Sequence, residues 1–240
     1  MTDIEYLKKY LEPSKLEEGI EQLKQGLPVQ YIVGNVDFYG YPIKVNRSVL
    51  IPRFETEELV DRTIRYVKQY LGESIRIVDL GTGSGCIAIT LKKELPSSDI
   101  VAVDISKEAL DVARQNARLN QVEITFLEGD MLKPLNGKFD LIISNPPYIG
   151  TEEKIMDLVY QNEPHQALFA PHQGLYYYEQ ILTHVENYLN QYFILAFEIG
   201  YQQGDALLEL AHSLFPQANI KIEQDLQGRD RYLFIINGRT

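Results

Sequence analysis

The chain has 240 residues, with 34 Asp and Glu against 23 Lys and Arg, which gives a formal net charge of −11. A hydrophobic fraction of 45% beside 24% charged residues is typical of a globular protein and excludes disordered and fibrous classes. The longest apolar run, Tyr192 to Phe197, is far shorter than the roughly 20 residues that cross a membrane. The first residues lack the apolar segment of a signal peptide, and the single cysteine, Cys86, excludes an internal disulfide. We expect a soluble, cytoplasmic protein.

The charge is unevenly distributed along the chain. Residues 151–240 carry 12 acidic and 5 basic side chains, so this segment holds −7 of the −11. A protein that neutralises many nucleic-acid phosphates usually has the opposite balance, with clustered Lys and Arg. An acidic surface also favours solubility without any specific partner. We therefore expect no stable nucleic-acid partner.

The first 50 residues predict one helix followed by a β-hairpin. Ser14 and Glu17 have the spacing of a capping box, and Gly26 stands where a helix C-terminus is expected. A helix is therefore predicted over about 14–25. Two extended runs then flank Gly40, which is typical of a hairpin. These runs are residues 31–39 and 41–50.

From residue 55 onward the pattern is that of an α/β protein. Apolar spacing predicts a helix over 55–71, and from residue 75 short apolar strands alternate with helix-length segments, as in βαβ units. The predicted strands are 75–80, 100–104, 124–130, 139–145, 192–198, 220–224 and 231–236. The predicted helices follow Gly85 and Ser106 and cover about 174–190 and 201–215. This order predicts a doubly wound, mostly parallel sheet with an antiparallel hairpin at one edge.

A glycine-rich turn joins the first strand of this sheet to the helix that follows it. Ligands bind at such turns in open α/β sheets, because glycine permits positive φ and a close approach to the backbone. Amides at the start of the helix also point into the crevice. A plain strand-to-helix turn is the alternative. The candidate cofactor residues here are Asp79, Gly81, Thr82, Gly83, Ser84 and Gly85.

Acidic residues follow the next two strands. Asp104 lies 19 residues after Gly85, where a carboxylate binds a ribose diol, although capping of the helix after Ser106 is an alternative. NAD and S-adenosylmethionine both fit, but Cys86 stands where the third dinucleotide glycine is expected, and the pattern resembles the first motif of class I methyltransferases. Asp130 and Met131, which follow the third strand, would contact adenine or simply form a turn. The further cofactor candidates are Asp104, Ile105, Asp130 and Met131.

The turn Asn145-Pro146-Pro147-Tyr148 follows the strand that ends beside the reactive end of such a cofactor. Two prolines fix φ and remove two backbone donors, which leaves rigid carbonyl acceptors. The Asn145 side-chain oxygen and the Pro146 carbonyl could then accept both hydrogens of a planar amino group. Tyr148 offers a ring that could stack on a flat substrate. Asn145, Pro146 and Tyr148 are the catalytic candidates, and Asn145 is also a cofactor candidate.

This arrangement suits methylation of an amide or aromatic amine nitrogen. The lone pair of such a nitrogen is delocalised, and holding its two N–H groups directs the lone pair toward the electrophilic methyl group. Transfer from a sulfonium requires no metal, and the four histidines have no ligand spacing, so no metal site is predicted.

Five segments together resemble the release-factor glutamine N5-methyltransferases, a class I family with a Rossmann-like fold. They are IPRFETE (51–57), VDLGTGSGCIAI (78–89), NPPYI (145–149), EPHQAL (163–168) and EIGYQQG (198–204). NPPY alone also occurs in DNA adenine methyltransferases, whereas the first and fourth segments are specific to this family. The resemblance covers about residues 26–240.

The resemblance implies methylation of the glutamine in the Gly-Gly-Gln motif of bacterial peptide chain release factors. It implies that S-adenosylmethionine contacts Gly81 to Gly85, Asp104, Met131 and Asn145, and that residues 145–148 hold the glutamine. Arg53, Glu55 and Thr56 would then belong to a loop that shapes the site. A purely structural role for Arg53 and Glu55 is the alternative. Arg53, Glu55, Asn145, Pro146, Pro147 and Tyr148 are thus the substrate-binding candidates.

Two departures from the family pattern are visible. Phe54 stands where the family usually has proline, and only one predicted helix precedes the hairpin, where the family has a helical docking domain. We expect a reduced N-terminal region over 1–50 and a catalytic domain over 51–240, acting as a monomer. The alternatives are a nucleic-acid amino-methyltransferase with the same NPPY chemistry, an NAD-dependent oxidoreductase and a non-catalytic adaptor that binds the cofactor.

Overall fold

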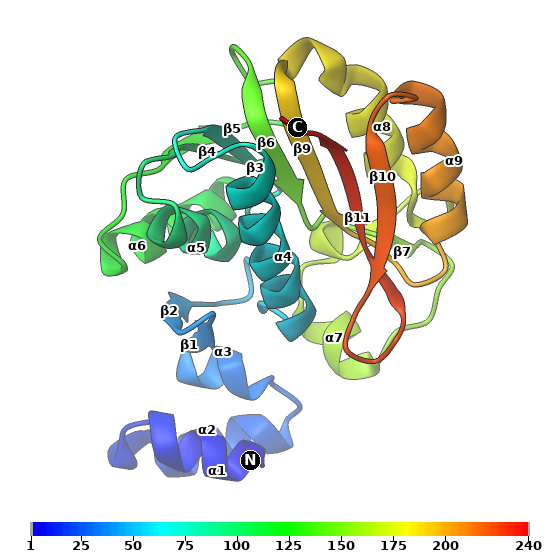
Figure 1. Ribbon diagram of the computed structural model, residues 1–240. Coiled ribbons are helices and arrows are strands. Elements are labelled where there is room, and N and C mark those ends of the chain that lie inside the picture. Colours follow the sequence, from blue (N-terminus) through cyan, green and yellow to red (C-terminus); the bar gives the residue numbers. More distant parts are fainter. Residues whose placement is uncertain (1, 240) are drawn as a thin grey trace.

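A computed structural model describes residues 2–239 and contains a seven-stranded sheet of order β10-β11-β9-β6-β3-β4-β5 (Figure 1). Strands β9, β6, β3, β4 and β5 are parallel, and β11 pairs antiparallel with both β9 and β10. The predicted α/β fold with an antiparallel edge hairpin is confirmed. The strands are β3 Arg76–Leu80, β4 Asp99–Asp104, β5 Thr125–Glu128, β6 Phe139–Ser144, β9 Leu189–Glu198, β10 Asn219–Gln224 and β11 Asp230–Asn237.

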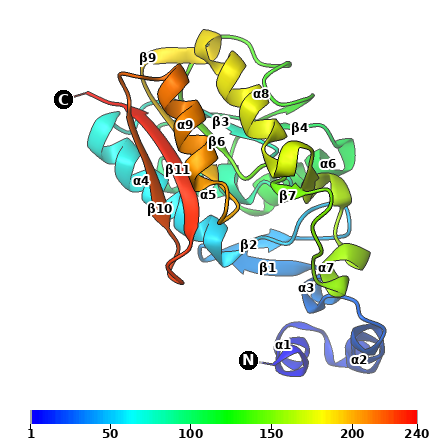
Figure 2. The same ribbon diagram turned by 90° about the vertical axis from the view of Figure 1, so that its right-hand side faces the viewer.

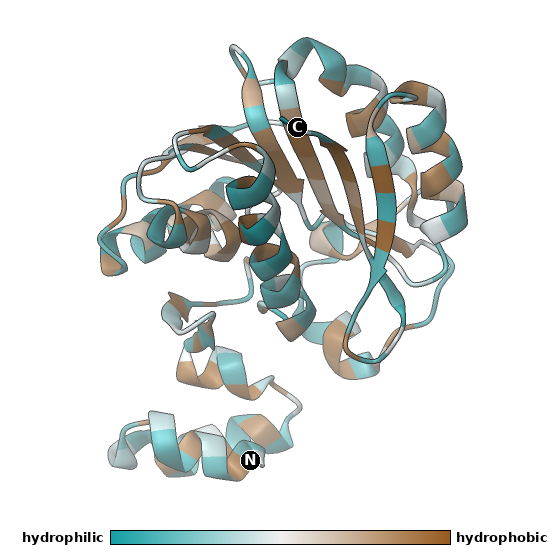
Figure 3. Cartoon of the chain, in the orientation of Figure 1, coloured by the Kyte–Doolittle hydropathy of each residue, from teal (hydrophilic) through white to brown (hydrophobic). Residues whose placement is uncertain are grey.

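Helices cover both faces of this sheet (Figure 2). Alternate strand residues point to opposite sides, so Ile77 and Ile143 pack under α4 and α5, whereas Val78 and Ile142 pack under α8 and α9. Figure 3 shows the strands as mainly hydrophobic ribbons between helices with polar outer surfaces. Burial on both faces explains why the central strands are almost uniformly apolar. The helices are α4 Phe54–Tyr70, α5 Cys86–Glu94, α6 Lys107–Leu119, α7 Asp157–Asn162, α8 Tyr176–His184 and α9 Gly204–Leu214.

The order of the strands places a crevice at the carboxyl ends of β3 and β6. From β3 the chain moves outward through β4 to β5 and then returns to β6 on the other side of β3. Connections therefore leave the ends of β3 and β6 in opposite directions, and such a switch point opens a binding crevice in α/β sheets. The Ser144 hydroxyl donates to the Leu80 carbonyl at 2.6 Å and ties these two strand ends together.

The N-terminal region contains more helix than the sequence predicted. Helices α1 Asp3–Tyr10 and α2 Leu16–Lys24 lie below the main body in Figure 1, and α3 Val29–Val33 occupies part of a run expected to be extended. The capping box forms at Thr2 and Glu5 instead of at Ser14. Ser14 lies inside a 3₁₀ helix, Pro13–Lys15, and a residue that is already in a helical turn cannot act as an N-cap.

The short helix α3 has identifiable end signals. Pro28 precedes it with φ −55°, and Gly34 ends it in the left-handed conformation, donating its N–H to the Gln30 carbonyl at 2.8 Å. These signals outweigh the β propensity of its Val and Ile residues. The predicted hairpin follows, with β1 Asn35–Phe38 paired to β2 Tyr41–Lys44. Its buried residues, among them Phe38 and Ile43, join the core that contains α4 and α5.

The remaining elements are short. Two-residue strands β7 Ile149–Gly150 and β8 Phe169–Ala170 pair in parallel after the Asn-Pro-Pro-Tyr turn. Further 3₁₀ helices cover His165–Ala167, His172–Gly174 and Val185–Tyr188. Within residues 2–239, no helix combines the length and apolarity that crossing a membrane requires.

Candidate functional site

The glycine-rich turn lies between the end of β3 and the start of α5. Gly81 and Gly83 have φ of 69° and 54°, and a Cβ built on either would have nothing within 4 Å. These two glycines are therefore required by backbone conformation, and they leave the backbone bare toward the crevice. Gly85 also has a positive φ, of 82°, and a Cβ there would lie 3.1 Å from the Cβ of Ala113, so this glycine in addition allows α5 and α6 to pack closely.

Asp104, the last residue of β4, joins the glycine turn to the next strand end. One carboxylate oxygen accepts from the Gly83 N–H at 2.8 Å and the other from the Ser106 N–H at 2.9 Å. Burial raises the pKa of Asp104 above its ordinary value. The N-cap of α6 is Ser106, whose hydroxyl accepts from the Ala109 N–H, so the alternative role of Asp104 as that cap is wrong.

Asp79 lies beneath the glycine turn and does not line the crevice. It is fully buried, and one carboxylate oxygen accepts from the Thr82 hydroxyl at 2.6 Å. Its other oxygen has no hydrogen-bond partner within residues 2–239. Burial is the main cause that raises the pKa of Asp79 to about 7. Asp79 therefore supports the turn from behind.

Apolar and acidic side chains from the ends of β4 and β5 form the adjoining wall. Ile105 is 62% exposed although it follows a strand that is buried after its first residue. Met131 has a φ of 47°, which is uncommon for a residue with a side chain and often marks a functional site. Asp130 accepts from the Lys133 ammonium at 2.6 Å. An exposed isoleucine beside this methionine provides an apolar surface for a flat ring.

Asn145 is held by a side chain from α4. Its Nδ2 donates to the Thr56 hydroxyl at 3.1 Å, and that hydroxyl donates to Glu198 Oε2 at 2.6 Å. The Tyr148 hydroxyl donates to the other oxygen of Glu198 at 3.2 Å. Burial raises the pKa values of both Tyr148 and Glu198. Both ends of the Asn-Pro-Pro-Tyr turn are therefore linked to one buried carboxylate at the end of β9.

A second buried carboxylate joins two segments at the entrance of the crevice. Glu163 accepts from the Ile51 N–H at 3.1 Å and forms an ion pair with Arg53. The ion-pair partner of Arg53 is therefore Glu163, which gives Arg53 a structural contact between two segments. The backbone carbonyl of Glu55 accepts from the Tyr232 hydroxyl at 3.0 Å. The ion pair holds residues 51–53 against the segment that contains Pro164.

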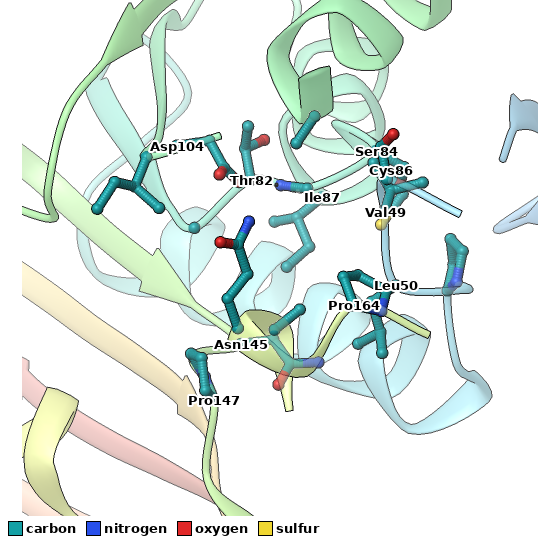
Figure 4. Close-up of a pocket in the computed structure, with 18 of the residues that line it drawn as sticks. Val49, Leu50, Thr82, Ser84, Cys86, Ile87, Asp104, Asn145, Pro147 and Pro164 are labelled. Atoms are coloured by element: carbon teal, nitrogen blue, oxygen red, sulfur yellow. Dashed lines mark hydrogen bonds between the residues drawn. The ribbon is translucent and has the colours of Figure 1, made fainter. Parts of the chain in front are cut away.

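These groups enclose one cavity with about 950 Å³ of empty space, including its open mouth (Figure 4). Figure 4 shows side chains from the glycine turn, the end of β4 and the Asn-Pro-Pro-Tyr turn gathered around it. The predicted residues that line it are Arg53, Gly81, Thr82, Gly83, Ser84, Asp104, Ile105, Asp130, Met131, Asn145 and Pro147.

Five predicted residues do not line the cavity: Glu55, Asp79, Gly85, Pro146 and Tyr148. Tyr148 points its hydroxyl to Glu198, so its ring is held by the protein in this structure. Pro146 is buried between its neighbours. No group of three His, Cys, Asp or Glu side chains suited to a metal occurs in the described part of the chain.

Comparison with known proteins identifies the family. The methyltransferase small domain family matches residues 56–167. Release factor glutamine methyltransferase of Enterococcus faecalis is 44% identical over 223 residues, which is 92% of this chain and 79% of that protein. Its counterpart in Staphylococcus aureus is 43% identical over 90% of this chain and 78% of that protein. The chain belongs to the release factor glutamine methyltransferase family.

A solved structure agrees with this assignment. The release factor-specific protein-(glutamine-N5) methyltransferase from Alicyclobacillus acidocaldarius is 25% identical, with a TM-score of 0.52. The match covers 82% of this chain and 99% of that chain. The resemblance stated from the sequence motifs, and the class I methyltransferase fold that it implied, are confirmed.

The release factor glutamine methyltransferase motifs converge on the pocket in a way that sequence reasoning did not predict. Thr56, Glu163 and Glu198 come from three separate motifs, yet each makes a hydrogen bond that positions the pocket. None of these contacts was assigned from the sequence. A usable signal was the position of Glu198 directly after the apolar run 192–197 of a predicted strand, because a buried carboxylate needs hydrogen-bond partners.

Proposed function

We propose that this protein transfers a methyl group from S-adenosylmethionine to the side-chain amide nitrogen of the glutamine in the Gly-Gly-Gln motif of peptide chain release factors. Membership of the family supports the reaction class. The observation that carries the proposal is the position of the Asn-Pro-Pro-Tyr turn beside a pocket with the features of a nucleoside site.

The residues of the pocket fit S-adenosylmethionine. The bare backbone at Gly81 and Gly83 admits a ligand close to the turn, and Asp104 places a carboxylate where ribose hydroxyls would donate to it. Ile105 and Met131 supply an apolar surface for adenine. When bound, the cofactor supplies an electrophilic methyl group on a sulfonium, so the protein needs to provide position and orientation.

The Asn-Pro-Pro-Tyr turn offers two free acceptors for the glutamine amide. Neither Asn145 Oδ1 nor the Pro146 carbonyl accepts a hydrogen bond from any other group within residues 2–239. Asn145 Nδ2 is already engaged with Thr56, which directs its oxygen toward a donor. The two acceptors would hold both N–H hydrogens of the substrate amide.

Holding both hydrogens addresses the weak nucleophilicity of an amide. The nitrogen lone pair is delocalised into the carbonyl and becomes available as the nitrogen pyramidalises. Acceptors that bind the hydrogens more tightly as the nitrogen becomes cationic favour the transition state over the ground state. The methylated nitrogen then loses one proton to water.

The division of the chain is part of the proposal. Residues 51–240 would form the catalytic domain and residues 1–50 a region that contributes to release factor docking. Several hydrogen bonds link these regions; the Asn162 side chain donates to the Gly26 carbonyl at 2.9 Å, and the Asn116 side chain donates to the Lys44 carbonyl at 2.9 Å. The net charge of −11 supports a basic protein partner over a nucleic acid. The protein would act as a monomer.

The decisive test incubates the purified protein with S-adenosylmethionine and an intact release factor, and then locates any added methyl group by mass spectrometry of the release factor peptides. We expect a single added methyl on the glutamine of the Gly-Gly-Gln motif. A release factor with that glutamine changed to alanine is the matched control and should remain unmodified. Methylation of adenine in added nucleic acid, with none on the release factor, would overturn the proposal.

A further inference from the structure

We infer that Glu198 is a positioning residue that orients the acceptor atoms of the Asn-Pro-Pro-Tyr turn through Thr56 and Tyr148. This inference rests on the proposed function for the identity of the reaction. Glu198 ends β9, is 1% exposed and does not line the pocket. It therefore acts on the site through other side chains.

The register of the sheet brings Glu198 beside the turn. Strands β6 and β9 are parallel neighbours, and Ser144 pairs with Phe197 at the last position of their ladder. Asn145 and Glu198 are the next residues along the two strands. Figure 1 shows the two strands adjacent in the middle of the sheet. Glu198 thus lies at one of the two strand ends that adjoin the turn, the other being that of β3.

The direction of the hydrogen bonds follows from the carboxylate. Ionised Glu198 can only accept, so the Thr56 hydroxyl donates its single proton to it at 2.6 Å. The Thr56 oxygen is then available only as an acceptor, and it accepts from Asn145 Nδ2 at 3.1 Å. This leaves Asn145 Oδ1 for a ligand. The direction of these two hydrogen bonds therefore decides that the oxygen of the Asn145 amide, and not its NH₂ group, is available in the pocket.

The same carboxylate fixes the other end of the turn. The Tyr148 hydroxyl donates to Glu198 Oε1, while the Tyr148 carbonyl accepts from Gln203 Nε2 at 2.9 Å. The Tyr178 hydroxyl also donates to the backbone carbonyl of Glu198 at 2.6 Å, which anchors the strand end itself. The Pro146 carbonyl lies between two residues held by one carboxylate, so its direction is constrained from both sides.

A carboxylate in this place is unfavourable for folding alone. Glu198 is buried among apolar residues, and burial raises its pKa. Arg231 is the compensating cation, but its side chain donates to Asp225 and to the Ile199 carbonyl instead of to Glu198. A well-packed apolar residue would often be at least as stable in such a site. The hydrogen bonds toward Asn145 and Tyr148 give the buried carboxylate a functional reason.

Glu198→Gln tests this inference because it keeps the shape and removes the obligatory acceptor. A glutamine amide can donate to Thr56, which reverses the hydroxyl and allows the Asn145 amide to turn over. We expect kcat on the release factor to fall about 10- to 100-fold, with the Kd for S-adenosylmethionine and the KM for the release factor within twofold. Asp225→Asn, which removes another buried carboxylate near Arg231, is the matched control and should leave kcat within twofold.

Substitutions of Thr56 keep the test valid if Glu198→Gln fails to fold. Thr56→Val removes the hydroxyl with little change of shape and should lower kcat to a similar extent, whereas Thr56→Ser should restore it to within about threefold. The double variant Thr56→Val with Glu198→Gln should be no more than twofold slower than the slower single variant, because both break one chain of bonds.

An NMR measurement separates this inference from the proposed reaction. The side-chain NH₂ resonance of Asn145, assigned by its loss in Asn145→Asp, is recorded without any release factor. It should shift in Glu198→Gln and Thr56→Val but stay in place in Asp225→Asn. A parent enzyme that methylates no release factor would reject the proposed function, whereas an unshifted resonance, or an unchanged kcat in folded Glu198→Gln, would overturn the role of Glu198.

Discussion

The two walls of the pocket are built in different ways. The wall proposed to bind the cofactor, here called the cofactor wall, consists of the glycine turn 81–85 and Asp104. Its contacts are local: Thr82 donates to Asp79 three residues away, and Gly83 donates to Asp104 across 21 residues. The opposite wall, here called the acceptor wall because it holds the proposed hydrogen-bond acceptors for the substrate, contains the Asn-Pro-Pro-Tyr turn and its supports. It joins segments that are distant in the chain, since 110 residues separate Arg53 from Glu163 and 142 separate Thr56 from Glu198. One wall depends on the glycine backbone and on hydrogen bonds between nearby residues, and the other on side-chain bonds between distant segments.

This difference has consequences for function. Under the proposed function, the glycine turn and the carboxylate of Asp104 bind the cofactor. The long-range bonds instead hold the side chain of Asn145 in one orientation, which under the proposed function directs its oxygen toward the substrate nitrogen. We expect substitutions in the cofactor wall to change cofactor affinity and substitutions in the acceptor wall to change turnover.

Asn145→Ala should have the largest effect and would establish the acceptor wall as the catalytic one. Removal of one acceptor that strengthens in the transition state should lower kcat by about 10²–10³-fold. The Kd for S-adenosylmethionine, measured by calorimetry, should rise much less than that. Asn190→Ala removes a similar side chain that donates to Asp140, away from the pocket, and should keep full activity. Equal turnover in the two variants would contradict the assignment.

Asp104→Ala should mainly affect the cofactor wall. The carboxylate would lose its hydrogen bonds to ribose and its hold on the Gly83 N–H, and we expect the Kd for S-adenosylmethionine to rise about 10- to 100-fold. Asp140→Ala, near the opposite end of the β6 strand, is the control and should leave the Kd unchanged. Retention of parental affinity in Asp104→Ala would exclude the ribose role.

Arg53→Met tests whether the acceptor wall needs its ion pair. Glu163 would remain buried with the Ile51 N–H as its hydrogen-bond donor, so the free energy of unfolding should fall by about 1–3 kcal/mol. Arg53 is about one-third exposed, which limits the effect. Arg65→Met removes an exposed pair with Asp61 and should cost less than about 0.5 kcal/mol in the same urea titration. Equal losses would argue against a special role for Arg53.

Asp79 should make the stability of the folded protein depend on pH. Its folded pKa of about 7 lies above the ordinary value of 3.8, so the folded state binds a proton that the unfolded state lacks between these values. Its contribution to stability is therefore greatest at low pH and is lost as the pH rises toward 7. Asp79→Asn should remove this slope: between pH 5 and 8, its melting temperature should rise relative to the parent. A constant difference would contradict the raised pKa.

Phe54→Pro should have the smallest effect. Phe54 is the first residue of α4, is 59% exposed, and follows Arg53 in an extended conformation that suits the residue before proline. We expect proline to raise the free energy of unfolding by about 0.4–1 kcal/mol, with activity within twofold. A loss of stability would indicate that the loop before α4 needs the flexibility that phenylalanine permits.

The sequence predicted local features well wherever a short pattern and its physical cause coincide. Glycines at 81, 83 and 85 between an apolar strand and a helix specified the turn, because their positive φ is a backbone property. The helix starting near Cys86 and the edge hairpin followed from periodicity alone. The predicted helix over 14–25 corresponds to α2, whereas α1 and α3 were missed, because such short helices depend on contacts with one another.

Only the tertiary structure decided the roles of the buried polar residues. The sequence by itself determined the α/β fold, the family and the pocket residues Gly83, Asp104 and Asn145. It could not show that Thr56 and Glu198 meet, because a hydrogen bond across 142 residues requires the sheet and α4 to be assembled first. Burial then makes each such bond consequential, since an unpaired polar group inside the protein is costly.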